Sequence, residues 1–199
     1  MFTLKIVFTL SVTIGITTIS NAQLKGTFTD TRDGNTYHWV QIGEQVWMSE
    51  NLAYKPSKGN WWLYNNNPFY TGKVGYLYDW QTAMVACPPG WHLPADREWA
   101  ELENYLGGSH IAGTRLKATS GWSNNGNGTN DAGFSALPGG MRKQFGEFSY
   151  MGITGRWWSA TPLRDERAVY RRLYFYKSSV RDSERMQSAM SVRCIKDHD

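Results

Sequence analysis

Two cysteines, Cys87 and Cys194, limit the folds open to this chain more than any other pair of its 199 residues. If the protein is exported, two cysteines most often form a single disulfide. Such a bond would join the middle of the chain to its end and close a loop of about 107 residues, worth about 4–5 kcal/mol in the chain-entropy description. The alternative is two separate buried thiols.

The first 22 residues have the pattern of a secretory signal peptide. Lys5 is their only charge, an apolar and threonine-rich run covers residues 6–19, and Ser20-Asn21-Ala22 offers small residues for cleavage after Ala22. The apolar run is too short to span a bilayer. No cysteine follows Ala22 directly, so no lipid anchor is expected. We therefore predict an exported protein, in the periplasm, on the outer surface or secreted, whose mature chain is soluble.

Residues 23–199 are predicted to form a single domain. Hydrophobic residues make up 41% of the sequence and aromatic residues 15%, which suits both a loop-rich core and a recognition surface. Without the leader, 20 basic and 17 acidic residues leave a formal charge of +3. Arginines gather in the last 36 residues, but acids are interleaved with them, so no clean basic face is expected. This argues against a nucleic-acid partner.

The N-terminal half predicts small strands, one long loop and short helices. Asp33-Gly34 and Gly43-Glu44 are turn signals between alternating runs in residues 26–50, which indicates two hairpins. Residues 55–76 show no regular period and read as a surface loop presenting aromatic side chains. Residues 78–86 have helical spacing.

A second helix is predicted after Pro94, with an apolar stripe of Trp99, Leu102 and Leu106 and a stop at Gly107-Gly108. Its charged residues fall off that stripe and are expected in solvent: Asp96, Arg97, Glu101 and Glu103. The C-terminal half reads as a Gly/Asn loop, a short apolar strand at 134–137, and three strand-like runs at 148–161, 168–182 and 188–197.

Five blocks together resemble a known family. In chain order they read DTRDGNTYHWVQIGEQVWMSENLAY, CPPGWHLPADREWAELENYLGG, GTNDAGFSALPGGMR, RWWSAT and SVRCIKD. They resemble the Fibrobacter succinogenes major paralogous domain, and the GWHLP and RC pieces also resemble formylglycine-generating-enzyme-like proteins. The resemblance implies an α+β, C-type-lectin-like fold: a small twisted mixed or antiparallel sheet, two flanking helices and long irregular loops. It also suggests a bacterium related to Bacteroidetes or Fibrobacter, and it brings no established activity.

This chain departs from the family pattern at one position. The family commonly has a threonine where this chain has Ala95, at the start of the 94–106 helix. We therefore expect Asp96 or Glu98 to satisfy the first free N–H groups of the helix.

Metal and enzyme chemistry find little support in the pattern. The four histidines are scattered, with no paired ligand spacing. The Asn/Gly loop at 124–131 offers oxygens, so Asn125, Asn127 and Asp131 are weak calcium candidates. Formylglycine-type oxidation needs a reactive cysteine pair, whereas this pair is expected in a disulfide. No two carboxylates stand out as a glycosidase pair. We expect no enzyme activity and no cofactor, with calcium as the one candidate ion.

Recognition is the favoured function. Aromatic faces and guanidinium groups are the make-up of glycan and protein hot spots. The candidate ligand-binding residues are Trp61, Trp62, Tyr64, Trp157, Arg171, Tyr174 and Tyr176. A strand over RWWSAT requires at least one of its tryptophans to point inward, and about half of these aromatics are expected in the core. The predicted function is a non-catalytic module at the cell envelope that binds a glycan or a surface protein. The alternatives are a structural or assembly component of the surface and, third, an enzyme.

Overall fold

The computed structural model describes residues 23–198, so the predicted signal peptide lies outside the described residues. The strands are β1 Lys25–Thr29, β2 Thr36–Ile42, β3 Gln45–Met48, β4 Trp61–Trp62, β5 Leu77–Asp79, β6 Trp91–His92, β7 Gly139–Arg142, β8 Phe148–Met151, β9 Thr154–Pro162, β10 Arg167–Tyr174, β11 Lys177–Arg185, β12 Ala189–Ser191 and β13 Ile195–Lys196. The helices are α1 Thr71–Val74, α2 Trp80–Ala86, α3 Asp96–Tyr105 and α4 Ser109–Leu116, with 3-10 turns η1 Tyr64–Asn66, η2 Pro68–Tyr70 and η3 Ser123–Asn125. None of the helices within residues 23–198 is long and apolar enough to cross a bilayer.

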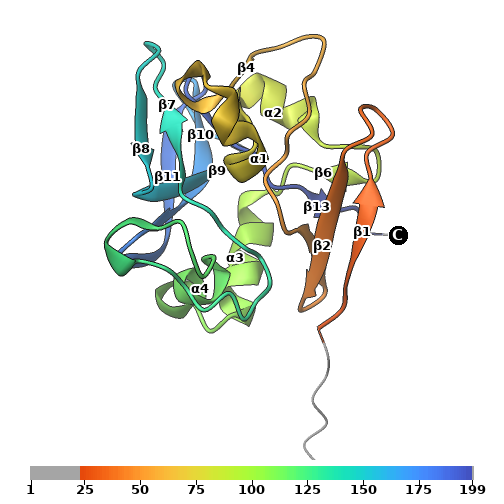
Figure 1. Ribbon diagram of the computed structural model, residues 1–199, viewed down its shortest axis with the longest axis vertical. Helices are drawn as coiled ribbons and strands as arrows, with labels where there is room; N and C mark the ends of the chain where they lie inside the picture. Colours follow the sequence, from red (N-terminus) through yellow and green to blue (C-terminus); the bar gives the residue numbers. More distant parts are fainter. Residues whose placement is uncertain (1–22, 199) are drawn as a thin grey trace, which may run out of the picture.

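The fold is α+β, as predicted, but it has two sheets where one was expected. Sheet A has the order β1-β2-β3-β13-β6, and sheet B has the order β11-β10-β9-β12-β5-β4, with β7 attached to β12 and β8 to β7. All pairings are antiparallel except β12 with β9, so sheet B is mixed. Figure 1 shows sheet A on the right, most of sheet B on the left, and α3 between them.

The two predicted N-terminal hairpins are confirmed. β1 pairs with β2, and β2 with β3, in antiparallel register. Gly34 and Gly43 lie in the two turns with φ of +76° and +64°, a conformation that favours glycine. β2 alternates as predicted, with Val40 and Ile42 buried against the core.

Helix α3 is confirmed with its apolar stripe of Trp99, Leu102 and Leu106, all buried. Of the two residues expected to satisfy the free N–H groups at its start, Glu98 does so: its carboxylate accepts the Ala95 N–H at 2.7 Å. The Asp96 N–H donates to the Thr161 hydroxyl at 2.9 Å, so a side chain from β9 replaces the missing cap.

Three local predictions are wrong. The helix predicted from residue 78 begins at Trp80, because Leu77–Asp79 pair with β12 and the Asp79 carboxylate caps the helix by accepting the Thr82 N–H. Residues 109–116 form α4, although the Gly/Asn loop was predicted to begin at residue 113. Residues 134–137 form no strand; they contribute one isolated bridge, from Lys117 to Ala136, because the buried Phe134 side chain fills the core instead.

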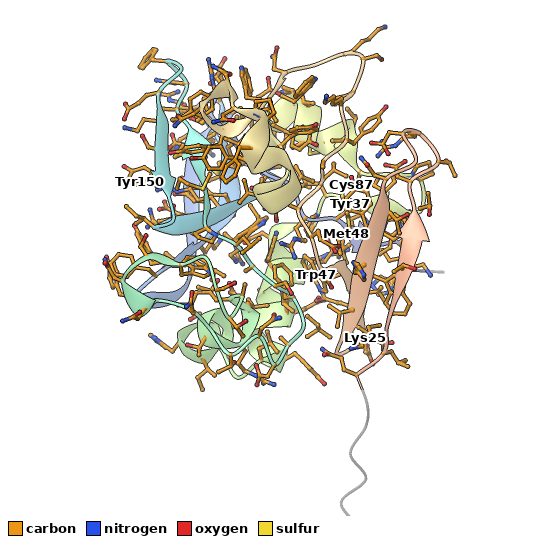
Figure 2. The ribbon with its side chains drawn as sticks, in the orientation of Figure 1. Lys25, Tyr37, Trp47, Met48, Cys87 and Tyr150 are labelled. Carbon is orange, nitrogen blue, oxygen red and sulfur yellow. A yellow bond between two sulfur atoms is a disulfide. The ribbon has the colours of Figure 1, made fainter. Side chains whose placement is uncertain are left out.

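Tryptophan fills the space between sheet A and α3. The Trp47 ring lies 4.7 Å from Trp99 and 5.7 Å from Phe134, and Trp99 lies 6.5 Å from Trp157 between ring centroids. Trp47 donates its indole N–H to Gln45 and Trp157 donates to Asn51. A buried indole usually finds an acceptor for its N–H, which explains the polar Gln45 and Asn51 in this core; the Trp99 Nε1 has no acceptor within residues 23–198. Figure 2 labels Trp47 and its neighbour Met48, which pack into two different core clusters.

The predicted Cys87–Cys194 disulfide is present, with the two Cα atoms 5.9 Å apart. It joins the end of α2 to the segment between β12 and β13. Cys194 is fully buried in the core cluster that also contains Met48 and Trp158. The alternative of two separate thiols is excluded.

His92 is bonded to two carboxylates at the entry to α3. Its Nδ1 lies 2.6 Å from Asp197 Oδ1, and its Nε2 lies 2.9 Å from Glu98 Oε1. The hydrogen bond to Glu98 is the main reason why the pKa of His92 is raised above its ordinary 6.5, with Asp197 adding to it. This imidazole therefore links the C-terminal strand to the start of α3.

We expect this link to weaken as the pH rises. Because the pKa of His92 is raised in the folded state, its stabilisation is complete below pH 6.5 and is lost as the pH passes through the raised value. The His92 side chain is 39% exposed, so the effect is less than about 1 kcal/mol. Thermal unfolding between pH 5 and 9 should show a small alkaline loss that His92→Gln lacks. Identical pH profiles for the two proteins would contradict this role.

Candidate functional site

Trp157 and Arg171 do not lie on the surface, so the predicted face that contained them is wrong. The two residues are register partners on β9 and β10, and partners directly opposite in a sheet point to the same side. That side packs against α3, and both side chains are buried. Trp158 is buried too, because elements cover sheet B on both faces at this point.

The buried Arg171 guanidinium is bonded to two carboxylates of α3. Its Nε donates to Glu103 at 3.0 Å and its Nη1 to Asp96 at 2.6 Å. The other Asp96 oxygen accepts from Arg181 at 2.7 Å, and the Ser179 hydroxyl donates to Glu103. Asp96 and Glu103 were predicted in solvent; this buried guanidinium draws them inward instead.

The opposite face of the same strands carries an aromatic and guanidinium surface. We call it the Arg–Tyr strip, and its members are Tyr150, Arg156, Tyr170, Arg172, Tyr174 and Tyr176. The Arg156 guanidinium lies 4.6 Å from the Tyr150 ring and 5.5 Å from Tyr170, and Arg172 lies 4.5 Å from Tyr174. The ring centroids of Tyr174 and Tyr176 lie 5.3 Å apart. Two predicted residues, Tyr174 and Tyr176, therefore belong to a continuous line of contacts.

The strip combines a buried base with exposed ends. Burial raises the pKa of Tyr170 to about 12, so its hydroxyl keeps its proton at neutral pH and donates to Asp182. Arg172 pairs with the same Asp182 at 3.1 Å, and its buried Nε has no acceptor within residues 23–198. Tyr176 is 60% exposed and Tyr150 is exposed on β8, where Figure 2 labels it. A ligand would meet the exposed rings of Tyr150 and Tyr176 and the partly exposed Arg172, whereas Arg156 and Tyr170 are buried beneath them.

The predicted residues of the 55–76 loop lie at the other edge of sheet B, on or beside β4. Trp61 is half-buried and packs on Tyr76 at 5.0 Å. Trp62 is half-buried beneath Arg142, whose guanidinium is 4.3 Å from its ring. Tyr64 is buried. The loop packs on β8, where the Tyr64 ring lies 5.4 Å from Phe148, whereas the strip members other than Tyr150 lie on β9, on β10 and in the turn after β10.

Side-chain oxygens of the candidate calcium loop already accept hydrogen bonds from the protein. Asn127 Oδ1 accepts the Trp122 N–H at 3.1 Å, and Asp131 accepts from Arg115 at 3.0 Å. Asn125 belongs to η3 with a left-handed φ of +57°. In the part of the chain that the structure describes, no three His, Cys, Asp or Glu side chains converge as a metal site would require. Calcium binding here stays a prediction.

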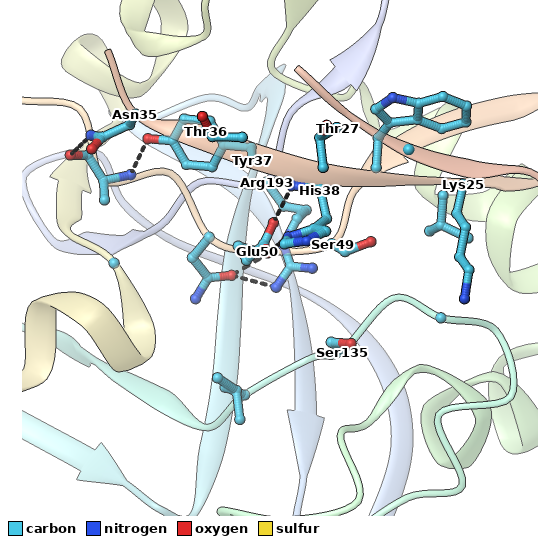
Figure 3. Close-up of a pocket in the computed structure, with 18 of the residues that line it drawn as sticks. Lys25, Thr27, Asn35, Thr36, Tyr37, His38, Ser49, Glu50, Ser135 and Arg193 are labelled. Carbon is cyan, nitrogen blue, oxygen red and sulfur yellow. Dashed lines mark hydrogen bonds and ion pairs between the residues drawn. The ribbon is translucent and has the colours of Figure 1, made fainter. Parts of the chain in front are cut away.

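A groove of about 940 Å³ lies between sheet A and the segment 130–137, and sequence reasoning missed it. Figure 3 shows His38 and Glu50 together at its upper wall, Arg193 at its floor and Ser135 opposite. Glu50 accepts the His38 backbone N–H at 2.8 Å, and its other oxygen lies 2.5 Å from His38 Nδ1. The available signal was the β2 alternation, which puts His38 on the inward face with Val40.

The polar residues around the groove come from distant parts of the sequence. Glu50 follows β3, Ser135 lies in the segment after the Asn/Gly loop, and Arg193 precedes Cys194. Pairing of β13 with β3 brings the last segment to this wall. The lining of the groove combines charged side chains with neutral polar ones, which suits binding of a polar ligand.

Comparison with known proteins identifies one family. The profile described as the Fibrobacter succinogenes major domain matches residues 40–196, which is most of the chain. No curated protein and no solved structure matches.

Proposed function

We propose that this chain, which belongs to the Fibrobacter succinogenes major domain family, is an exported, non-catalytic binding module of the bacterial cell envelope. Its ligand in this proposal is a glycan or a surface protein, and its fold is of the C-type-lectin-like class. The Arg–Tyr strip is the observation that carries the proposal. It replaces the predicted face, because the inward residues of the same strands are committed to the core.

The strip suits recognition for a physical reason. Tyrosine offers a broad face with few rotatable bonds, so ordering it on binding costs little entropy. Arg172 adds directed donors, and its buried Nε is a donor for which sheet B supplies no acceptor within residues 23–198. A ligand oxygen that reached it would gain a hydrogen bond that the free protein does not make.

Export is supported by two independent features. The leader has the charge, apolar run and small residues that a signal peptidase needs. A buried disulfide that closes a loop this long is typical of proteins that mature in an oxidising compartment.

The strip makes a direct prediction for binding. A glycan array and a pull-down with envelope extract should each return a ligand, and Tyr176→Ala and Arg172→Gln should each weaken its binding at least about tenfold. Truncating a hot-spot side chain removes contact area and a donor while leaving the fold intact. Affinity is measured by calorimetry or surface plasmon resonance on the ligand recovered.

Tyr105→Ala is the matched control. Tyr105 lies on α3 and is 65% exposed, close to the 60% of Tyr176, but it is not in the strip. Trp62→Ala tests the 55–76 loop in the same assay and should leave affinity unchanged. The strip is the wrong surface if Tyr105→Ala or Trp62→Ala abolishes binding while Tyr176→Ala and Arg172→Gln do not.

A structural or assembly role is the second candidate, favoured by one exposed side chain. Phe145 stands 92% exposed at the tip of the β7–β8 hairpin, where an apolar ring in water suggests a protein contact. A component of an assembly would self-associate in sedimentation experiments, lose that association in Phe145→Ser, and show no glycan affinity.

A further inference from the structure

The inner wall of the groove is set by strand register. Lys25 pairs with Val40 and Thr27 with His38, so these four residues share one face of the β1–β2 ribbon. Val40 belongs to the core, which fixes this face as the inward one. Trp39 lies on the other face, where its indole covers Gly26: a Cβ there would lie 2.7 Å from the ring. The groove wall therefore presents a lysine, a hydroxyl and an imidazole.

The charges of the groove do not cancel. Glu50 is the one acid among the lining residues, and both of its oxygens are already bonded to His38. Lys25 stands at the rim, and Arg193 lies at the floor. A visiting anion thus meets the exposed Lys25 and a carboxylate that is already bonded, while the buried Arg193 adds its positive charge from beneath the groove.

Arg193 is a buried cation held by neutral oxygens. Its Nε and Nη2 donate to Asn51 Oδ1 at 3.1 and 2.7 Å, and its Nη1 donates to the carbonyls of Met48, at 3.2 Å, and Phe134. Burial lowers the pKa of Arg193 to about 9, which still leaves it charged at neutral pH.

The remaining lining is rich in small hydroxyl and amide side chains. They include Thr27, Thr36, Ser49, Asn130 and Ser135. Asn130 donates to the Ser135 hydroxyl at 3.0 Å, which orients that hydroxyl, at a residue with a left-handed φ of +55°. Side chains of this kind match the hydroxyl groups of a sugar, each able to donate and accept.

We propose that this groove binds an acidic sugar of the uronic acid class, with its carboxylate at Lys25, in the field of the buried Arg193, and its hydroxyls on the Thr27 and Ser135 walls. The site is separate from the Arg–Tyr strip, so the two proposals stand or fall independently. The volume lies within the range of ligand pockets in general.

The test compares two sugars that differ at C6, which is a carboxylate in one and a hydroxymethyl group in the other. A trimer of galacturonic acid and the neutral galactose trimer are titrated into the full protein, with the galacturonate polymer as a further arm. We expect the acidic trimer to bind at least about tenfold more tightly than the neutral one, and this preference to shrink with added salt. Binding of the polymer but not the trimer would locate the natural source in a polysaccharide and keep the acidic class.

Two variants should move the affinity in opposite directions. Lys25→Gln removes a cation and should weaken acidic trimer binding about fivefold, whereas Glu50→Gln removes the nearby anion and should strengthen it about twofold to fivefold. Both side chains reach the surface, and Gln at position 50 still accepts the His38 N–H, so both variants should fold; unchanged thermal unfolding checks this. Lys58→Gln, at an exposed lysine that does not line the groove, is the matched control and should leave affinity unchanged, whereas Arg172→Gln tests whether the ligand lies on the strip instead.

The proposal is overturned by any of three results. These are equal affinity for the neutral and acidic trimers, no binding of the acidic trimer or polymer at millimolar concentration, and loss of acidic binding in Arg172→Gln but not in Lys25→Gln. The last result would move the ligand to the strip and would support the proposed function while rejecting this groove.

Discussion

Replacing both Cys87 and Cys194 by alanine is expected to lower the free energy of unfolding by about 4–5 kcal/mol. The disulfide closes a loop with a sequence separation of 107 residues, and opening so long a loop restores a large conformational entropy to the unfolded chain. For a domain of this size the change corresponds to a fall in melting temperature of about 10–15 °C. Thermal and denaturant unfolding of the double variant measure it.

Reductant provides the control for this prediction. Dithiothreitol should lower the melting temperature of the parent protein toward that of the double variant and should leave the variant unchanged. Alanine is the suitable replacement because Cys194 is fully buried, and a serine hydroxyl there would add its own cost. A double variant within about 1 kcal/mol of the parent would show that native contacts alone hold the last strand.

Local signals predicted the parts of the fold whose causes are local. The hairpins follow from turn glycines and alternation, α3 follows from a 3.6-residue stripe ending at Gly107-Gly108, and the disulfide follows from a cysteine count. Helix α4 was missed because its sequence SHIAGTRL offers only Ala112, Gly113 and Leu116 as buried residues. That is too few to establish a helical period.

The candidate site was mislocated by one residue along β10. Neighbouring residues on a strand point to opposite faces, so Arg171 and Arg172 have the same chemistry and opposite fates. The sequence has no local mark that separates them, since the face that is inward depends on where α3 packs. The groove was missed for a related reason: Glu50 and Arg193 come together only through the pairing of β3 with β13.

This difference of one residue gives the second large prediction. Arg171→Met should lower the free energy of unfolding by about 3–5 kcal/mol, because it leaves the buried Glu103 and the partly buried Asp96 without their shared cation. Arg172→Met, one position along, should cost less than about 1 kcal/mol, since it removes a pair with the 37% exposed Asp182. Urea unfolding of the two variants under one buffer measures the contrast.

A double variant separates the charge effect from lost packing. If the cost of Arg171→Met comes from an uncompensated carboxylate, then Arg171→Met with Glu103→Gln should recover part of it, because the second change removes that charge. Asp96 keeps Arg181, whose Nε lies 2.7 Å from its carboxylate, so it needs no second replacement. A double variant no more stable than Arg171→Met would assign the loss to packing, and equal stability of the Arg171→Met and Arg172→Met variants would contradict the buried ion pair itself.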